Sequence, residues 1–115
     1  MTQDPMVVVA FKDIEHDERI REAIQQRCQD LRAEFHEVKR FEITFLEDGG
    51  AGFSAHGHVT GKREDVGAHA TAKALMPAAE ALLDKLERQL RKIHDKRIFS
   101  QRREAQRDAM RRKTS

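Results

Sequence analysis

The 115-residue sequence contains no tryptophan, no tyrosine and only one cysteine. The lone Cys28 excludes a disulfide within the chain, and its place on an apolar helical phase predicts a reduced core residue. No stretch approaches the roughly 20 apolar residues that a membrane-spanning helix needs. The N-terminus, residues 1–5, shows no basic segment followed by a long apolar one, which a signal peptide would have. We therefore expect a cytoplasmic protein.

Charge is abundant but unevenly distributed. The formal net charge is only +2, yet residues 85–115 hold 12 Lys and Arg against 4 Asp and Glu. Residues 1–84 hold 10 against 16. Such segregation predicts that the C-terminal end meets a polyanion while the rest keeps the protein in solution. A basic tail exposed to solvent, with no partner, is the alternative.

The hydrophobic pattern predicts one domain over residues 1–99. The β-branched run at 7–11 predicts a buried strand, and Asp17 is a plausible N-cap for an amphipathic helix over about 17–35. Residues 41–45 alternate as a half-buried strand does, and 48–50 predict a turn. Residues 53–60 and 66–72 alternate similarly and predict a hairpin.

A second helix is expected to begin near Pro77, which suits a first turn because its missing amide hydrogen would be unpaired there. Its apolar stripe runs from Ala79 to Ile93, and a narrow basic stripe lies beside it. Arg97 returns to the apolar phase, so we expect the helix to leave the core near that point. Residues 100–115 contain no Leu, Ile, Val or Phe and predict a flexible basic tail, or a frayed helical extension. The basic stripe consists of Lys85, Arg88, Lys92 and Lys96.

The order strand, helix, three strands, helix predicts the fold class. Three strands in a meander, with one more strand at the edge, can bury two helices on a single face. The expectation is an α+β two-layer sandwich, β-α-β-β-β-α, with a four-stranded sheet and both helices on one face.

Residues 84–92, DKLERQLRK, continuing to Lys96, resemble the second-helix signature of ribosome hibernation-promoting factors. This family is also known as the ribosome-associated inhibitor or sigma-54 modulation protein family. Residues 66–72, VGAHATA, resemble its last strand, and the resemblance covers about residues 6–98. The chain departs from the family at residues 12–14, where a polar turn is usual, and at Met76 and Pro77. Since no dimerising second domain follows, it resembles the short form.

The resemblance implies a function. Family members bind the small ribosomal subunit between head and body, overlap the sites of messenger and transfer RNA, and silence idle ribosomes. The resemblance therefore implies the small subunit and its ribosomal RNA as partners, no cofactor, and a monomer when free. Basic side chains on a rigid helix suit contacts to phosphates, and missing Trp and Tyr argue against a platform for single strands. The expected RNA contacts are Lys85, Arg88, Lys92 and Lys96, followed by Arg91 and Lys73.

An enzyme is not expected. Gly61-Lys62 is not a phosphate-binding loop, because Arg63 replaces the Ser or Thr and His56 stands where the first Gly belongs. The adjacent acids at 47–48 and 64–65 point to opposite faces of a strand, so neither pair is a ready acid–base couple. No serine or cysteine has a recognisable base near it in the sequence.

Two further possibilities stay open at this stage. If the hairpin pairs Val59 with Val66, then His56 lies opposite His69 with His58 on the same solvent face, and three imidazoles can hold zinc or copper. No fourth ligand can be named, so contacts to water or RNA phosphate are favoured and no metal is expected. The alternative function is a general binder of structured RNA, or a protein-interaction module that modulates a transcription factor.

Overall fold

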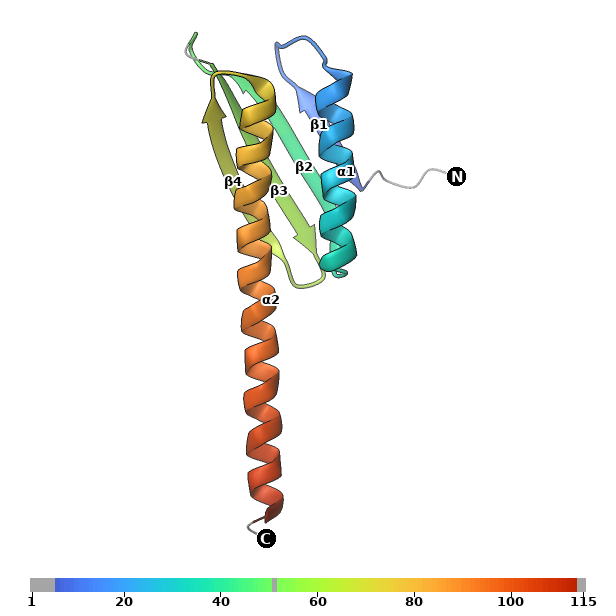
Figure 1. The fold of residues 1–115 in the computed structure, drawn as a ribbon, viewed down its shortest axis with the longest axis vertical. Helices are drawn as coiled ribbons and strands as arrows, with labels where there is room; N and C mark the ends of the chain where they lie inside the picture. Colours follow the sequence, from blue (N-terminus) through green and yellow to red (C-terminus); the bar gives the residue numbers. More distant parts are fainter. Residues whose placement is uncertain (1–5, 51, 114–115) are drawn as a thin grey trace, which may run out of the picture.

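The computed structural model describes residues 6–50 and 52–113, with side chains through Ile98. Its elements follow the predicted order β-α-β-β-β-α (Figure 1). They are β1 (Val7–Phe11), α1 (Glu18–Glu34), β2 (Val38–Glu47), β3 (Phe53–Gly61), β4 (Asp65–Ala72) and α2 (Leu75–Lys113). The predicted N-cap is confirmed, since the carboxylate of Asp17 accepts from the backbone N–H of Arg19 at 3.0 Å.

The four strands form one sheet in the order β1-β2-β3-β4. β1 pairs with β2 in parallel, and the two following pairs are antiparallel. The hairpin register is the predicted one, with Val59 opposite Val66 and His56 opposite His69. A parallel first pair requires a crossover between its strands, and α1 provides it.

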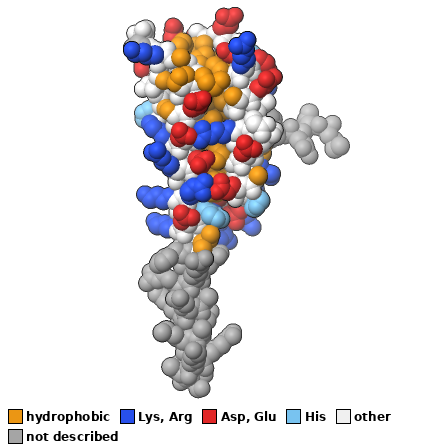
Figure 2. Space-filling view, in the orientation of Figure 1, with side chains coloured by type: hydrophobic (Ala, Val, Ile, Leu, Met, Phe, Trp, Pro, Cys, Tyr) orange, Lys and Arg blue, Asp and Glu red, His pale blue; other side chains and the backbone are white. Residues whose placement is uncertain are grey.

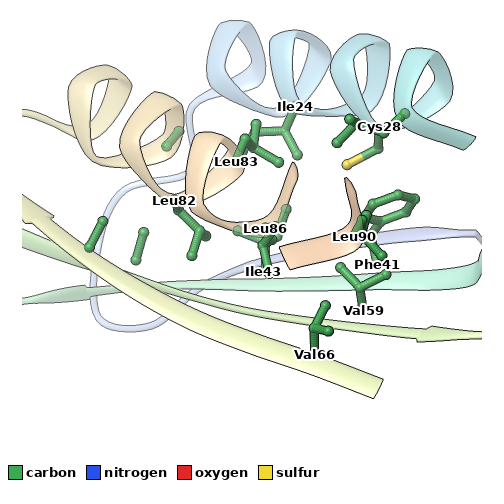
Figure 3. Packing of buried hydrophobic residues seen from close by; sticks show 14 of the residues in the cluster. Ile24, Cys28, Phe41, Ile43, Val59, Val66, Leu82, Leu83, Leu86 and Leu90 are labelled. Carbon is green, nitrogen blue, oxygen red and sulfur yellow. The ribbon is translucent and has the colours of Figure 1, made fainter. Parts of the chain in front are cut away.

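Both helices cover the same face of the sheet, as predicted (Figure 1). Leu82, Leu86 and Leu90 of α2 pack on the inward side chains of the strands. Ile24 and Cys28 of α1 belong to the same buried cluster (Figure 3). The approach is tightest over Gly57, where a Cβ would lie 2.9 Å from Leu86 Cδ1. The absence of a side chain at this position therefore brings α2 close to β3.

Cys28 is a core residue, as its helical phase predicted. Its side chain is fully buried in the cluster between α1 and the sheet. Burial raises the pKa of the Cys28 thiol to about 12, and the nearby charge of Arg27 lowers it only in part. A thiol held in its neutral form is a poor nucleophile, so the packing role accounts for this residue.

Helix α2 is 39 residues long and continues well past the end of the sheet (Figure 1). The backbone of residues 100–113 is helical. Of the two alternatives for the basic tail, this agrees with the helical extension. A domain boundary after residue 99 and a mobile tail stay predictions. Among the described residues, no helix combines the length and apolarity needed to cross a bilayer.

Candidate nucleic-acid interface

The basic stripe lies on the exposed side of α2, beside its buried face. Arg88, Lys92 and Lys96 are all exposed, whereas Leu86 and Leu90, from the same turns, are fully buried. Across the residues whose side chains are described, none of these three cations forms an ion pair. Figure 2 shows Lys and Arg side chains projecting along the left edge of the molecule. The packing of α2 thus presents uncompensated positive charge on a rigid support.

Lys85 differs from the rest of the stripe, because it also contacts the sheet. Its Nζ donates to the backbone carbonyl of His69 at 2.8 Å, and one turn later Gln89 Nε2 donates to the carbonyl of Gly67 at 2.9 Å. Both carbonyls belong to β4, one of the two edge strands of the sheet. An unpaired strand edge tends to pair with other chains, so these two side chains protect it.

Arg91 of α2 joins the two helices through its ion pairs with Glu34 of α1 and Glu87 of α2. Figure 2 shows acidic and basic side chains interspersed over the helical face. The Arg91 guanidinium donates to both carboxylate oxygens of Glu34, at 2.7 and 3.2 Å, and to Glu87 at 3.4 Å. These bonds raise the pKa of Arg91, the bond to Glu34 contributing most. Arg27 of α1 similarly pairs with Asp84 of α2. The charges between the two helices are largely balanced, in contrast to the stripe.

Lys73 is the sixth predicted contact, and the structure separates it from the others. It is exposed in the connection between β4 and α2, where it helps to line a surface hollow with Glu47, Gly52 and Phe53. This connection is at the opposite end of the sheet from the point where α2 passes beyond it (Figure 1). The structure therefore brings together the four residues of the stripe but not Lys73.

Arg97 lies in a cluster of charged side chains that the sequence did not predict. We call it the Arg97 cluster, and it comprises Arg97, Glu37 and Glu64. Arg97 Nη2 donates to Glu64 Oε1 at 2.6 Å, and Nη1 donates to Glu37. The side chain of Glu64 is only 3% exposed. The return of Arg97 to the apolar phase predicts that α2 leaves the core near that point, whereas the side chain reaches two carboxylates on that face instead. A cation on the buried phase of a helix needs an anionic partner, because an unpaired buried charge is costly, but the sequence does not identify that partner.

The ionisation of the Arg97 cluster follows from its hydrogen bonds. The bond from Arg97 lowers the pKa of Glu37 more than any other contact does, and the charges of Arg63 and Lys62 lower it further. The bonds to Glu37 and Glu64 raise the pKa of Arg97. A carboxylate with a depressed pKa stabilises the fold above its unfolded pKa, and this contribution is lost as the pH falls through the folded value.

The three histidines lie on the open face of the sheet, as the register predicted, but they do not converge on one point. The rings of His56 and His69 stack with centroids 5.8 Å apart. His58 instead pairs with Asp65 on the neighbouring strand. Among the described side chains there is no group of three or more His, Cys, Asp or Glu that could hold a metal ion.

The fold and the surface chemistry define a class: an open-faced α+β sandwich with a cationic helix at one edge of its helical layer. Residues 7–98 match the family described as sigma 54 modulation protein / S30EA ribosomal protein, and the chain belongs to that family. The resemblance found in the sequence is thereby confirmed.

Two solved structures share the fold. A ribosomal subunit interface protein from Coxiella burnetii is 17% identical, with a TM-score of 0.69 over 77% of this chain and 97% of that one. The N-terminal domain of Protein Y from Thermus thermophilus is 16% identical, with a TM-score of 0.65 over 74% of this chain and 93% of that one. No curated protein sequence matches the chain.

Proposed function

We propose that this protein is a translation inhibitor that binds structured RNA of the small ribosomal subunit and occludes the sites of messenger and transfer RNA. The observation that carries the proposal is the exposure of Arg88, Lys92 and Lys96 on a helix fixed to the sheet by Leu86 and Leu90. A surface ordered before binding loses little entropy when it meets phosphates. Family membership supports the ribosome as the source of those phosphates.

Folded RNA suits this surface better than single strands do. Proteins that bind single strands stack bases on exposed aromatic rings, and this chain has neither Trp nor Tyr. The five phenylalanines whose side chains are described are buried or half-buried. A cationic helix contacts phosphates without reading bases, so the shape of the RNA is expected to determine the site.

The mode of action follows from binding alone. We propose a monomer when free, located in the cytoplasm, that inhibits by steric exclusion and uses no cofactor and no catalysis. Such an inhibitor is effective only while its site on the subunit is empty. Competition with messenger and transfer RNA is therefore the property that separates it from a general RNA binder.

The test is a double charge reversal, Arg88→Glu with Lys92→Glu, in purified small subunits and in a purified translation system. Both side chains are exposed, so the variant should fold normally, lose binding and lose inhibition. The matched control is Lys12→Glu with Arg19→Glu, which changes the charge equally at the opposite end of the domain (Figure 1). Both cations are exposed, and neither pairs with an acidic side chain that the structure describes. Equal loss in both variants would show that net charge, and not the stripe, drives binding.

A second measurement examines occlusion directly. Wild-type protein should bind vacant subunits and be displaced as messenger and transfer RNA fill them. Equal binding to vacant and filled subunits would contradict occlusion and leave general binding of structured RNA as the function. Binding to a protein partner in the absence of ribosomes would instead favour a protein-interaction module.

A further inference from the structure

The turn between β3 and β4 carries two cations that the basic stripe does not include. Lys62 and Arg63 are exposed, and neither forms an ion pair with any side chain that the structure describes. The turn lies at the end of the sheet where α2 passes beyond it (Figure 1). Lys92 and Lys96 lie toward the same end along α2, on a different side of the helix from Arg97, so two separate elements carry positive charge at this end of the domain.

Backbone hydrogen bonds both close this turn and attach it to a neighbouring segment. Gly61 N–H donates to Glu64 O at 2.9 Å, and Lys62 N–H donates to Glu37 O at 3.0 Å. Gly61 is packed so closely that a Cβ would lie 2.4 Å from Glu37 O and 2.5 Å from Glu64 Oε2. The backbone on either side of the two cations is therefore held against the connection between α1 and β2.

The Arg97 cluster completes this attachment at an electrostatic penalty. Arg97 of α2 binds Glu64, which belongs to the turn, and Glu37, which lies in the connection between α1 and β2. The cluster therefore ties the turn to both of these segments. Glu64 Oε2 and Arg97 Nε are buried without a hydrogen-bond partner. Buried ion pairs are a poor source of stability, because desolvation offsets much of their attraction. A function for the position of the turn explains why such a pair is present.

We propose that the β3–β4 turn is a second contact with RNA phosphates, made by Lys62 and Arg63, and that Glu64 and Arg97 are its positioning residues. The proposal rests on the proposed function, since it assumes that the partner is structured RNA of the small subunit. It adds a contact outside α2, so that RNA is held by two elements whose relative placement is fixed. A long flexible lysine on a fixed turn reaches a phosphate with less loss of entropy than one on a mobile loop.

The first test reverses the charge of the turn, with Lys62→Glu and Arg63→Glu in one variant of the full chain. Each lost phosphate contact lowers the slope of log affinity against log salt by about 1, so the slope should fall by about 2. Affinity for small subunits at physiological salt should fall about tenfold or more, because contacts to phosphates supply much of the binding free energy. The control is again Lys12→Glu with Arg19→Glu. If turn and control variants lose affinity equally, the turn is not a contact.

The second test separates positioning from charge. Glu64→Gln removes a negative charge beside the turn, which by electrostatics alone should strengthen binding to RNA. If Glu64 positions the turn, the same change should weaken binding, and it should have little further effect in the Lys62→Glu, Arg63→Glu background. Tighter binding, or an equal loss in both backgrounds, would overturn the positioning role. Circular dichroism would establish that each variant is folded at the temperature of the assay.

If the Glu64→Gln variant fails to fold, the Arg97→Lys variant tests the positioning role instead. It keeps the charge but removes the planar fork that reaches both carboxylates. Weaker RNA binding by the folded variant supports positioning, and unchanged binding contradicts it. Failure of wild-type protein to bind small subunits would reject the proposed function itself. Wild-type binding that depends on Arg88 and Lys92 but not on the turn would reject this inference alone.

Discussion

Lys85 of α2 donates a hydrogen bond to the backbone carbonyl of His69 on β4, at 2.8 Å. The same side chain thus belongs to the basic stripe and to the protection of a sheet edge. Gln89 makes the equivalent bond to Gly67 one turn later. Lys85 therefore contributes to the stability of the sheet edge as well as to the basic stripe, whereas Arg88 makes no bond to β4 among the described side chains. The effects of replacing the two residues can be compared.

Lys85→Met should lower stability more than Arg88→Met, and RNA affinity less. The methionine keeps an apolar stem of similar length but loses the bond to His69, which is worth about 0.5–1.5 kcal/mol. Arg88 makes no bond to the part of the protein with described side chains, so its replacement should leave the unfolding free energy nearly unchanged. Urea unfolding and binding to small subunits, measured on both variants, check the prediction. The reverse order of effects in both assays would contradict it.

Gly57→Ala should destabilise the domain by overpacking. The new Cβ would meet Leu86 Cδ1 at 2.9 Å and Leu82 Cδ2 at 3.1 Å, so the helix or these side chains must move. Overpacking of this kind costs about 1–3 kcal/mol. Leu86→Ala alone should cost about 2–5 kcal/mol, because it opens a cavity in a packed core.

The two changes at this contact should not be additive. Removing the Leu86 side chain leaves room for the alanine, so the double variant should be more stable than the sum of the single effects indicates. A double-mutant cycle from chemical unfolding gives the coupling energy directly. Strict additivity would show that α2 does not press on Gly57 in solution.

The order of the elements, the hairpin register and the shared face of the helices were predictable from the sequence, whereas β2 is longer than the predicted 41–45 and α2 begins at Leu75, before Pro77. The predictable parts follow from local features such as the alternation in 53–60, the cap at Asp17 and the 3.6-residue period of α2. The Arg97 cluster was not predictable, because Glu64 and Glu37 are 33 and 60 residues away from Arg97. Similarly, the sequence places Lys85, Arg91 and Lys92 on neighbouring surfaces of one helix, but only the tertiary contacts show that Arg91 is paired with Glu34.

Cys28 should be inert to thiol reagents in the folded protein and reactive once the protein unfolds. Its pKa of about 12 lies above the ordinary value of 9.0. A raised pKa adds stability that is fully present below the unfolded pKa and is lost as the pH rises toward the folded value. The free energy of unfolding should therefore decline between about pH 9 and 12, and Cys28→Ala should reduce this decline. Rapid labelling of the native protein at pH 7 would contradict the buried position.

The helical extension of α2 gives the last prediction, which concerns residues 100–115. This segment holds 6 Lys and Arg against 2 Asp and Glu, so it adds positive charge beyond the end of the sheet. Deleting it should weaken binding to small subunits and flatten the dependence of affinity on salt, because fewer counterions are released. The domain should still unfold cooperatively, since the hydrophobic side chains of α2 that are described in the core extend from Leu75 to Ile93, all within residues 1–99. A variant that keeps the length but replaces the six cations with glutamine separates charge from helix length. If that variant binds as the wild type does, while the deletion does not, the extension contributes through its shape. If neither change alters affinity or its salt dependence, the extension is passive and the RNA contacts lie within residues 1–99.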